Sequence, residues 1–385
     1  MKRYISLAIV IFLTISSLHA DGKDVKQEQP VHQYLVREAY NLLKFQLGYD
    51  VPEMVDHVGN TQTGSHAFNP GGFLVIGAWR EDEEDLVYGY NSLPKSPYHT
   101  CTHFWKSDDG DGARWTVGIG TWENAYEKAN KYIYGANAFS GSWIFNMGGI
   151  SYCYDSIFHY YKHRVITAII SPFKQLIRHS SANRDKIAWE VLGRVCHLLG
   201  DMGMPAYAHN DAHPSIIWPF GDPDAYEIAM RTEHVKSNYL HAAKTGGIIN
   251  VIGKQNPLKY LFYTTNQIAQ FFPSKNSPGN NTYGINEPFS NYPPLQEIIN
   301  GLGPVPTSVN VDQIRETAFV YSMRAAAGLL FWFAVESGLI LVIKVPQDYT
   351  NIEQAVNATA NTNYRVIYFR KFLKIYFFTF CIANV

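Results

Sequence analysis

Helical spacing of apolar residues is the feature that most constrains the fold of this chain. Between His32 and Leu43, for example, Leu35, Ala39 and Leu42 fall on one stripe of a helix. No convincing strand pattern precedes residue 338. Helices are predicted for the segments His32–Leu43, Trp122–Tyr134, Ile157–Ile177 (interrupted at Pro172), Asp185–Leu199, Asp224–Leu240 and Asp312–Val335. The sequence therefore predicts an all-α domain.

Local signals refine the ends and the surroundings of these helices. Thr121 is expected to cap the helix that follows it. Arg324 lies within the last apolar segment and favours a core helix over a membrane span. Connections rich in Gly, Pro and Asn cover residues 56–72, 86–100 and 274–310. Loops of that length in a compact domain are usually functional or mobile.

The N-terminus has the pattern of a secretory signal peptide. Lys2 and Arg3 precede an apolar run from Ile5 to Ile15, and the small residue Ala20 follows. The run is shorter than the ~20 residues that a membrane-spanning helix needs. We therefore expect residues 1–20 to be removed and the helical domain, residues 21–340, to be secreted or periplasmic.

Composition limits the class of partner. The chain has 385 residues, 46% of them hydrophobic, which is enough to bury a large core. A formal net charge of -1 gives no electrostatic basis for binding a polyanion, so no long nucleic acid is expected as a partner. Aromatic residues make up 15% of the chain. They mostly fill cores, and the rest are compatible with a ligand pocket or peripheral membrane contact.

The C-terminal region differs from the helical domain. Val345–Ala358, within residues 341–365, resembles the opening coil of a right-handed parallel β-helix, yet no stacked repeats follow it. Residues 366–385 are basic and aromatic, without a helix or strand pattern. We interpret this region as a truncated second domain followed by an out-of-frame tail. The alternative is a natural tail that associates with a membrane.

The strongest chemical signal begins at His197 and Asp201. Residues four apart share one face of a helix, so an imidazole and a carboxylate at this spacing suit a zinc-type ion. Such a pair alone is more often solvated, but His209 and His213 follow closely. Two of the four cysteines, Cys101 and Cys196, adjoin or lie near candidate ligands, which raises a disulfide as one option. Their pairing stays open.

Five stretches together resemble the bacterial zinc-dependent phospholipase C family, whose fold is shared with the fungal single-strand-specific zinc nucleases. In chain order they are Val31–Ala39, Gly77–Asp82, His103–Phe104, Val191–Pro205 and Trp218–Glu227. The similarity covers residues 31–240 and extends more loosely to 337. The resemblance implies a multi-helix phospholipase C-like domain with two or three zinc ions.

The resemblance also implies a ligand set. Asp82, His103, His197 and Asp201 would hold one ion, with Asp201 bridging to a second ion that takes His32. A third ion would take Glu227. Asp82 is the candidate general base as well as a ligand, because it would lie beside the attacking water. Its acidic neighbours, Glu81 among them, are expected to form a solvated loop.

Three departures from the family pattern affect these expectations. Tyr207 and Pro223 stand where the pattern has histidine ligands of the Glu227 ion. His209 and His213 are close enough in the sequence to substitute, and Asp222 or Asp224 would add oxygen ligands. No Trp precedes His32, where the family uses an N-terminal Trp as a ligand. Cleavage after Ala20 would expose the amine of Asp21 for that role.

The function predicted from the sequence is hydrolysis of a phosphoester by metal-activated water, with a phospholipid as the first substrate class. The alternative within the same fold is a 3′-nucleotidase or single-strand nuclease. The alternative of another class is a non-catalytic, zinc-stabilised binding module. The sequence makes no prediction about oligomeric state.

Overall fold

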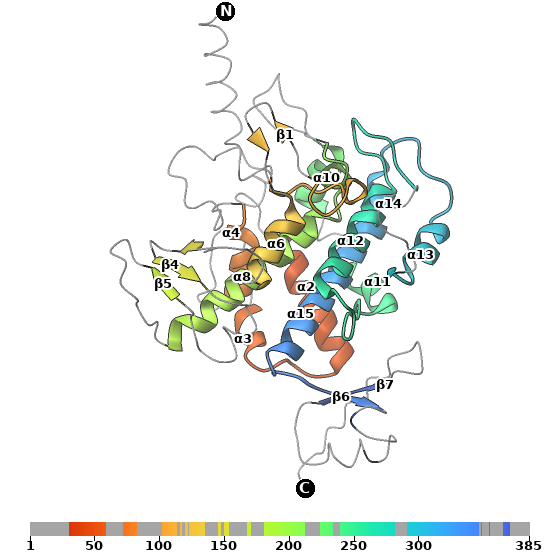
Figure 1. Cartoon of the computed structure of the whole chain (residues 1–385). Helices are drawn as coiled ribbons and strands as arrows, with labels where there is room; N and C mark the ends of the chain where they lie inside the picture. Colours follow the sequence, from red (N-terminus) through yellow and green to blue (C-terminus); the bar gives the residue numbers. More distant parts are fainter. Residues whose placement is uncertain are drawn as a thin grey trace, which may run out of the picture.

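The structure is a computed structural model of the chain, and it is mainly helical (Figure 1). The residues that it describes are 31–58, 72–82, 102–113, 116–117, 120–121, 123–134, 145–147, 150–153, 168–170, 181–211, 224–233, 239–281, 291–345, 348, 354 and 365–369. The predicted signal peptide and Asp21 lie outside these residues.

Helices make up most of the described chain, and their apolar faces share one hydrophobic core. In chain order the helical segments are α2 (Val31–Leu47), α3 (Met54–Val58), α4 (Phe73–Arg80), η1 (Ser107–Asp109), α6 (Ala125–Tyr134), α8 (Ser181–Asp201), α9 (Pro205–Ala208), α10 (Ala225–Glu233), α11 (Tyr239–Gly246), α12 (Pro257–Gln270), α13 (Leu295–Gly301), α14 with η4 (Val311–Ile314 and Arg315–Phe319) and α15 (Val320–Glu336).

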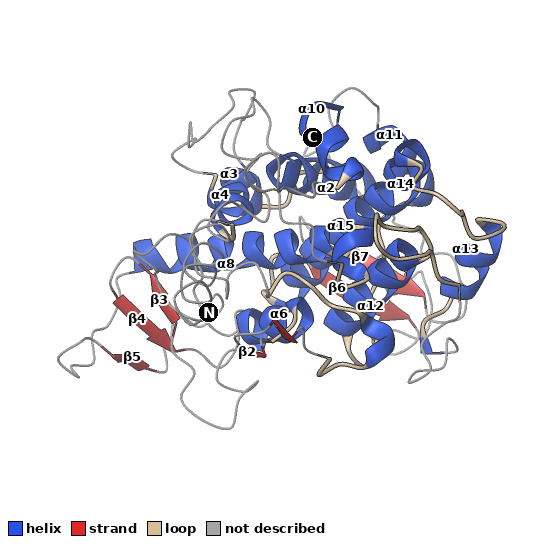
Figure 2. Cartoon of the chain, turned by 90° about the horizontal axis from the view of Figure 1, so that it is seen from above, coloured by secondary structure: helices blue, strands red, loops and turns tan. Residues whose placement is uncertain are grey.

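The centre of the molecule is formed by α2, α4, α8 and α15, which pack against one another (Figures 1 and 2). Glycines let α4 and α8 approach closely. A Cβ on Gly77 would lie 1.9 Å from the carbonyl oxygen of Glu190, and one on Gly193 would lie 1.9 Å from that of Leu74. Because these contacts are to backbone, the crossing of α4 and α8 requires glycine at both positions.

The segment Val311–Glu336 forms one continuous helical stretch, with a π-helical turn at η4. Among the described residues it is the one helix long and apolar enough to cross a membrane, but 89% of its most apolar window is buried inside the protein. Arg324 donates hydrogen bonds to the carbonyl oxygens of Gly246 and Gly247. The segment is therefore placed as a core helix of this domain.

Short strands interrupt the helical body. The hairpin β1–β2 joins Thr116–Val117 to Gly120–Thr121, and an antiparallel sheet joins β3 (Phe145–Met147), β4 (Ile150–Cys153) and β5 (Ala168–Ile170). This sheet lies to one side of the helices, near the start of α8 (Figure 2). No strand was expected here, and the helix predicted for Ile157–Ile177 is wrong over β5. Its β-branched residues pair with β4, and such pairing overrides a short helical pattern.

One helix boundary also differs from the prediction. Thr121 belongs to β2, and the cap of α6 is Asn124. The side chain of Asn124 accepts from the Glu127 N–H at 2.8 Å, and the Glu127 carboxylate accepts from the Asn124 N–H at 3.2 Å. This reciprocal pair is a capping box. Of the helix predicted for Asp224–Leu240, the described residues form α10 and the start of α11, and residues 234–238 lie outside the described part of the chain.

At the C-terminal end, β6 (Leu341–Val345) pairs in parallel with β7 (Arg365–Phe369). The register runs from Leu341 opposite Arg365 to Val345 opposite Phe369. The pair lies below the helical body in Figure 1. β7 reaches into residues 366–385, where the sequence showed no strand pattern.

Candidate metal centre

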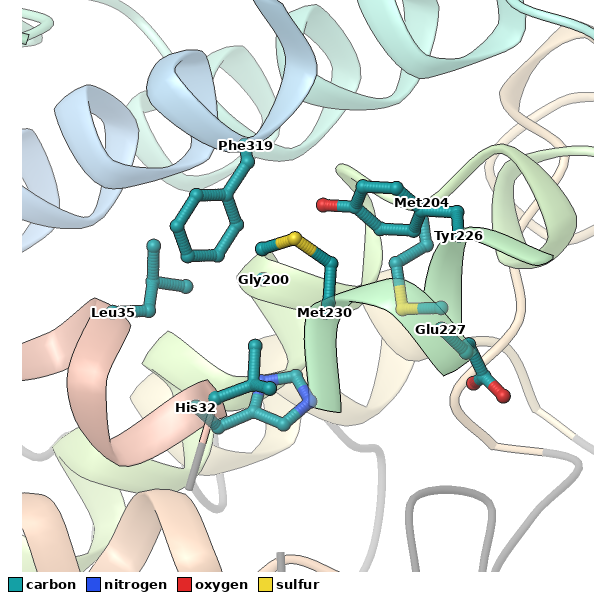
Figure 3. A pocket seen from close by; sticks show the side chains of 9 residues that line it. His32, Leu35, Gly200, Met204, Tyr226, Glu227, Met230 and Phe319 are labelled. Carbon is teal, nitrogen blue, oxygen red and sulfur yellow. The ribbon is translucent and has the colours of Figure 1, made fainter. Parts of the chain in front are cut away.

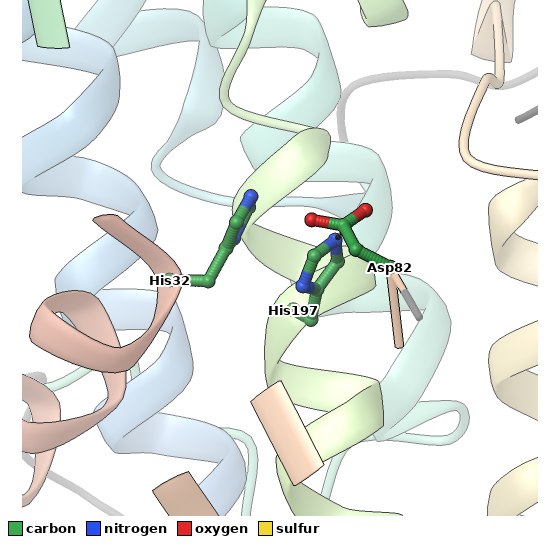
Figure 4. A group of neighbouring side chains, drawn as sticks. All are labelled: His32, Asp82 and His197. Carbon is green, nitrogen blue, oxygen red and sulfur yellow. Dashed lines mark ion pairs between the residues drawn. The ribbon is translucent and has the colours of Figure 1, made fainter. Parts of the chain in front are cut away.

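Five of the predicted ligands meet in one buried cluster. His32 lies in the first turn of α2, Asp82 follows α4, His103 precedes η1, and His197 and Asp201 lie one turn apart on α8. The five residues are at most 3% exposed. Figure 4 shows His32, Asp82 and His197 converging from their three segments. Positions far apart in the sequence therefore supply one site.

The distances within the cluster are those of neighbouring metal ligands. Asp201 Oδ2 lies 2.7 Å from His103 Nδ1 and 3.3 Å from His197 Nε2. Asp201 Oδ1 lies 3.4 Å from His32 Nε2, and Asp82 Oδ1 lies 3.5 Å from His197 Nε2. Two sets have all their ligand atoms within 4.8 Å of one another: His32 with Asp82 and His197, and His103 with His197 and Asp201. Each set could hold a metal ion.

The ring of His197 is oriented by a backbone acceptor. Its Nδ1 lies 2.5 Å from the carbonyl oxygen of Ala78, which belongs to the last turn of α4. Carbonyls in a last turn lack helical donors, so an Nδ1–H donated to Ala78 satisfies one of them. This hydrogen bond leaves Nε2 as the ligand atom, as is usual for metal-binding histidine. His197 belongs to both sets. Because one Nε2 binds one ion, His197 can serve only one of the two sets at a time.

The carboxylates of the cluster are not fully satisfied by hydrogen bonds. Both carboxylate oxygens of Asp82 are buried and have no hydrogen-bond partner among the described residues, and neither does Nε2 of His197. Burial opposes the charged form of His197, but Asp82 and Asp201 outweigh it and raise its pKa from 6.5 to about 10. The site thus favours a cation, either a proton on His197 or a metal ion.

A second group of buried charges lies behind the cluster. Glu81 is fully buried, so the prediction that it belongs to a solvated loop is wrong. Its carboxylate contacts Lys128 Nζ at 2.5 Å and Arg194 Nη1 at 3.0 Å, and it accepts from Tyr132 Oη at 2.9 Å. Arg194 also reaches Glu190 at 3.3 Å. Local sequence gave no signal for this burial, because the two cations come from distant helices.

Glu227 lies close to the cluster and contacts Tyr207. The Tyr207 hydroxyl donates to Glu227 Oε1 at 3.4 Å. Burial and the charge of Glu227 raise the pKa of this phenol well above its ordinary value, so it stays protonated as the donor. Glu227 and His32 line the same pocket (Figure 3). The other lining residues are Val31, Leu35, Gly200, Met204, Tyr226, Met230 and Phe319.

The remaining predicted residues are placed differently. His209 Nε2 lies 2.9 Å from the carbonyl oxygen of Phe272, and burial lowers its pKa, so a neutral ring donates to that oxygen. His209 belongs to neither of the two ligand sets found among the described residues. His213, Asp222 and Pro223 lie outside the residues that the structure describes. Cys196 is a free, buried thiol, and Cys101 lies outside the described residues.

Comparison with known proteins yields no relative. No family model matches the chain, and no significant match was found to a curated protein or to a solved structure.

Proposed function

We propose that this chain is a secreted, zinc-dependent phosphoester hydrolase of the phospholipase C type. The observation that carries the proposal is the buried convergence of three imidazoles and two carboxylates: His32, Asp82, His103, His197 and Asp201. Nitrogen and oxygen donors at these distances suit zinc. The buried Asp82 oxygens fit such an ion, because they lack hydrogen-bond partners in the described part of the chain.

Zinc held by these side chains would polarise a phosphoryl oxygen and lower the pKa of a water molecule toward ~7. The protein's own residues transfer the proton and orient the ligands. Asp82 accepts the proton of the water that attacks phosphorus, the P–O ester bond breaks, and the proton ends on the leaving alcohol. The Ala78 carbonyl fixes the ring of His197. Asp201 faces all three imidazoles and holds them around one centre.

A phospholipid is the substrate class that we propose first. The pocket beside His32 and Glu227 is lined mainly by apolar side chains, among them Leu35, Met230 and Phe319. The free space in this pocket is about that of one water molecule, so the choice of a phospholipid rests on the resemblance of the sequence to the phospholipase C family. A net charge of -1 gives no support for a long nucleic-acid groove.

The C-terminal strand pair adds a proposal about architecture. The register of β6 and β7 is parallel and unshifted over five residue pairs. Successive coils of a parallel β-helix pair in this way. The pairing supports the interpretation of residues 341–365 as the opening of such a solenoid.

The test of the function compares wild type with His197→Ala and, as a matched control, His241→Ala. His241 is exposed on α11 and belongs to neither ligand set. Wild type and His241→Ala should each contain two or three zinc ions by elemental mass spectrometry and should hydrolyse phosphatidylcholine vesicles. His197→Ala should lose zinc and at least ~100-fold in turnover, because it loses a ligand present in both sets.

A second candidate is a non-catalytic, zinc-stabilised binding module. The near-complete burial of all five ligands favours it, since closed sites are typical of structural zinc. Zinc bound without hydrolysis of phosphatidylcholine, of a 3′-nucleotide or of single-stranded DNA would establish this candidate. Hydrolysis of the nucleotide substrates alone would instead identify a nuclease-type enzyme. Absence of bound metal would contradict both candidates.

A further inference from the structure

The buried charges behind the metal centre touch three of the four segments that supply its ligands. Glu81 directly precedes Asp82, and Arg194 lies one helical turn before His197 on α8. Thr102 directly precedes His103, and its hydroxyl accepts from Lys128 Nζ at 3.0 Å. Each of three ligands therefore adjoins one member of the same network.

Lys128 is the residue that joins these segments. Its ammonium lies 2.5 Å from Glu81 Oε1 and 3.0 Å from Thr102 Oγ1, and its side chain is fully buried. It thereby links the end of α4, which carries Asp82, to the loop that carries His103. Lys128 itself comes from α6, which supplies no ligand.

Arg194 completes the connection to α8. Its Nη1 lies 3.0 Å from Glu81 Oε2 and 3.3 Å from the backbone oxygen of Arg80. Glu81 thus receives one cation from α6 and another from α8, while Tyr132 donates to it as well. Such a carboxylate has little freedom to rotate or shift, and neither does the peptide that leads to Asp82.

The buried part of the network holds two cations, Lys128 and Arg194, and two carboxylates, Glu81 and Glu190. The partly exposed Arg80 also pairs with Glu190, at 3.1 Å. Buried ion pairs are weak contributors to stability and are better suited to fixing geometry. The contribution expected from this network is the placement of ligands.

We infer that Glu81 and Lys128 are positioning residues of the metal centre, holding Asp82 and His103 in place around His197, the ligand that the two sets share. This inference rests on the metal centre proposed above. Both residues act through the ligands beside them rather than on the metal or the substrate. Hydrogen-bonded residues behind metal ligands typically account for 10- to 100-fold in affinity, so an effect of about this size is expected.

The chain offers a matched control on the same helix. Lys131 lies one turn from Lys128, and it pairs with the buried Glu123. Glu123 directly precedes Asn124, the cap of α6, whereas Glu81 directly precedes a predicted metal ligand. Lys128→Met and Lys131→Met therefore each remove one buried cation from α6. Both should lower the melting temperature of the metal-free protein, since each takes a cation away from a buried carboxylate.

The experiment measures zinc affinity by chelator competition and the visible absorption spectrum of the Co²⁺-loaded protein. Lys128→Met should weaken zinc binding about 10- to 100-fold and alter the Co²⁺ spectrum. Lys131→Met should match wild type in both. Glu81→Gln, which keeps the shape of the side chain and removes its charge, should reproduce the effect of Lys128→Met and serves if that variant does not fold.

Three results overturn the inference. Zinc affinity of Lys128→Met or of Glu81→Gln within about twofold of wild type would show that the network places no ligand. An equal loss in Lys131→Met would show that general destabilisation is the cause. Wild-type protein that binds neither Zn²⁺ nor Co²⁺ would overturn the metal centre itself, and the wild-type titration alone reports that failure.

Discussion

Gly200 determines how closely the ring of His32 can approach helix α8. A Cβ at this position would lie 2.8 Å from Leu35 Cδ2 and 3.0 Å from His32 Nδ1. The same ring also stacks on His197, with 3.6 Å between ring centroids. A glycine between His197 and Asp201 thus makes room for a ligand from another helix.

Gly200→Ala should weaken metal binding with little change in stability. The added methyl group crowds His32 at a cost of about 1–3 kcal/mol, and the better helix propensity of Ala offsets about 1 kcal/mol. Zinc affinity measured by chelator competition should fall, while urea unfolding of the metal-free protein should change by about 1 kcal/mol. Gly301→Ala is the control, because no atom lies within 4 Å of its added Cβ. Unchanged zinc affinity in Gly200→Ala would contradict this role.

The crossing of α4 and α8 is the element-scale feature on which the centre depends. It brings the Ala78 carbonyl to His197 and the end of α4, with Asp82, against the ligand face of α8. Gly77 and Gly193 permit this approach, since added Cβ atoms would overlap backbone oxygens. Because both contacts are to backbone atoms, no side chain can move aside to relieve the overlap.

Gly77→Ala should therefore separate the two helices or prevent folding. Overpacking usually costs 1–3 kcal/mol, and a backbone clash places the expected loss in free energy of unfolding at about 3 kcal/mol or more. Urea denaturation followed by circular dichroism checks this value. Gly112→Ala, with no atom within 4 Å of its added Cβ, should stay close to wild type. A stable Gly77→Ala variant would mean that the crossing is looser than the structure shows.

Helices were predicted well wherever an apolar stripe extends over several turns, as in α2, α8 and the stretch Val311–Glu336. Prediction failed where non-local pairing decides the structure, as for β5, which pairs with β4. The ligands His32, Asp82, His103, His197 and Asp201 were predicted as one cluster from a resemblance, and the structure brings them together. The burial of Glu81 could not be predicted, because it depends on cations from α6 and α8.

At the scale of the whole molecule, metal binding, folding and protonation are coupled at this centre. The ligands come from positions 32, 82, 103, 197 and 201. An ion bound there would connect α2 and α8 with the segment after α4 and the loop before η1. In the metal-free protein, Asp82 and Asp201 overcome the effect of burial and raise the pKa of His197 to about 10. A proton on this imidazole then takes the place of the ion.

The sign of the resulting pH dependence follows from the raised pKa. Because the folded value lies above the ordinary value of 6.5, the stability that protonated His197 gives to the metal-free protein is complete below pH 6.5 and is lost as pH rises toward about 10. Metal binding requires the neutral ring, so it must displace that proton. Metal affinity and metal-free stability therefore change in opposite directions as pH rises.

Between pH 6 and pH 8, apparent zinc affinity should therefore rise about tenfold per pH unit, with about one proton released per ion bound at His197. Isothermal titration calorimetry in buffers of different ionisation enthalpy measures both quantities. Over the same range, the melting temperature of the metal-free protein should fall, because protonated His197 contributes less to the free energy of unfolding as pH rises. Zinc binding that is independent of pH, with no proton released, would mean that His197 is already neutral in the metal-free protein. The two carboxylates would then be balanced by another cation, and the zinc ion would not replace a proton at this ring.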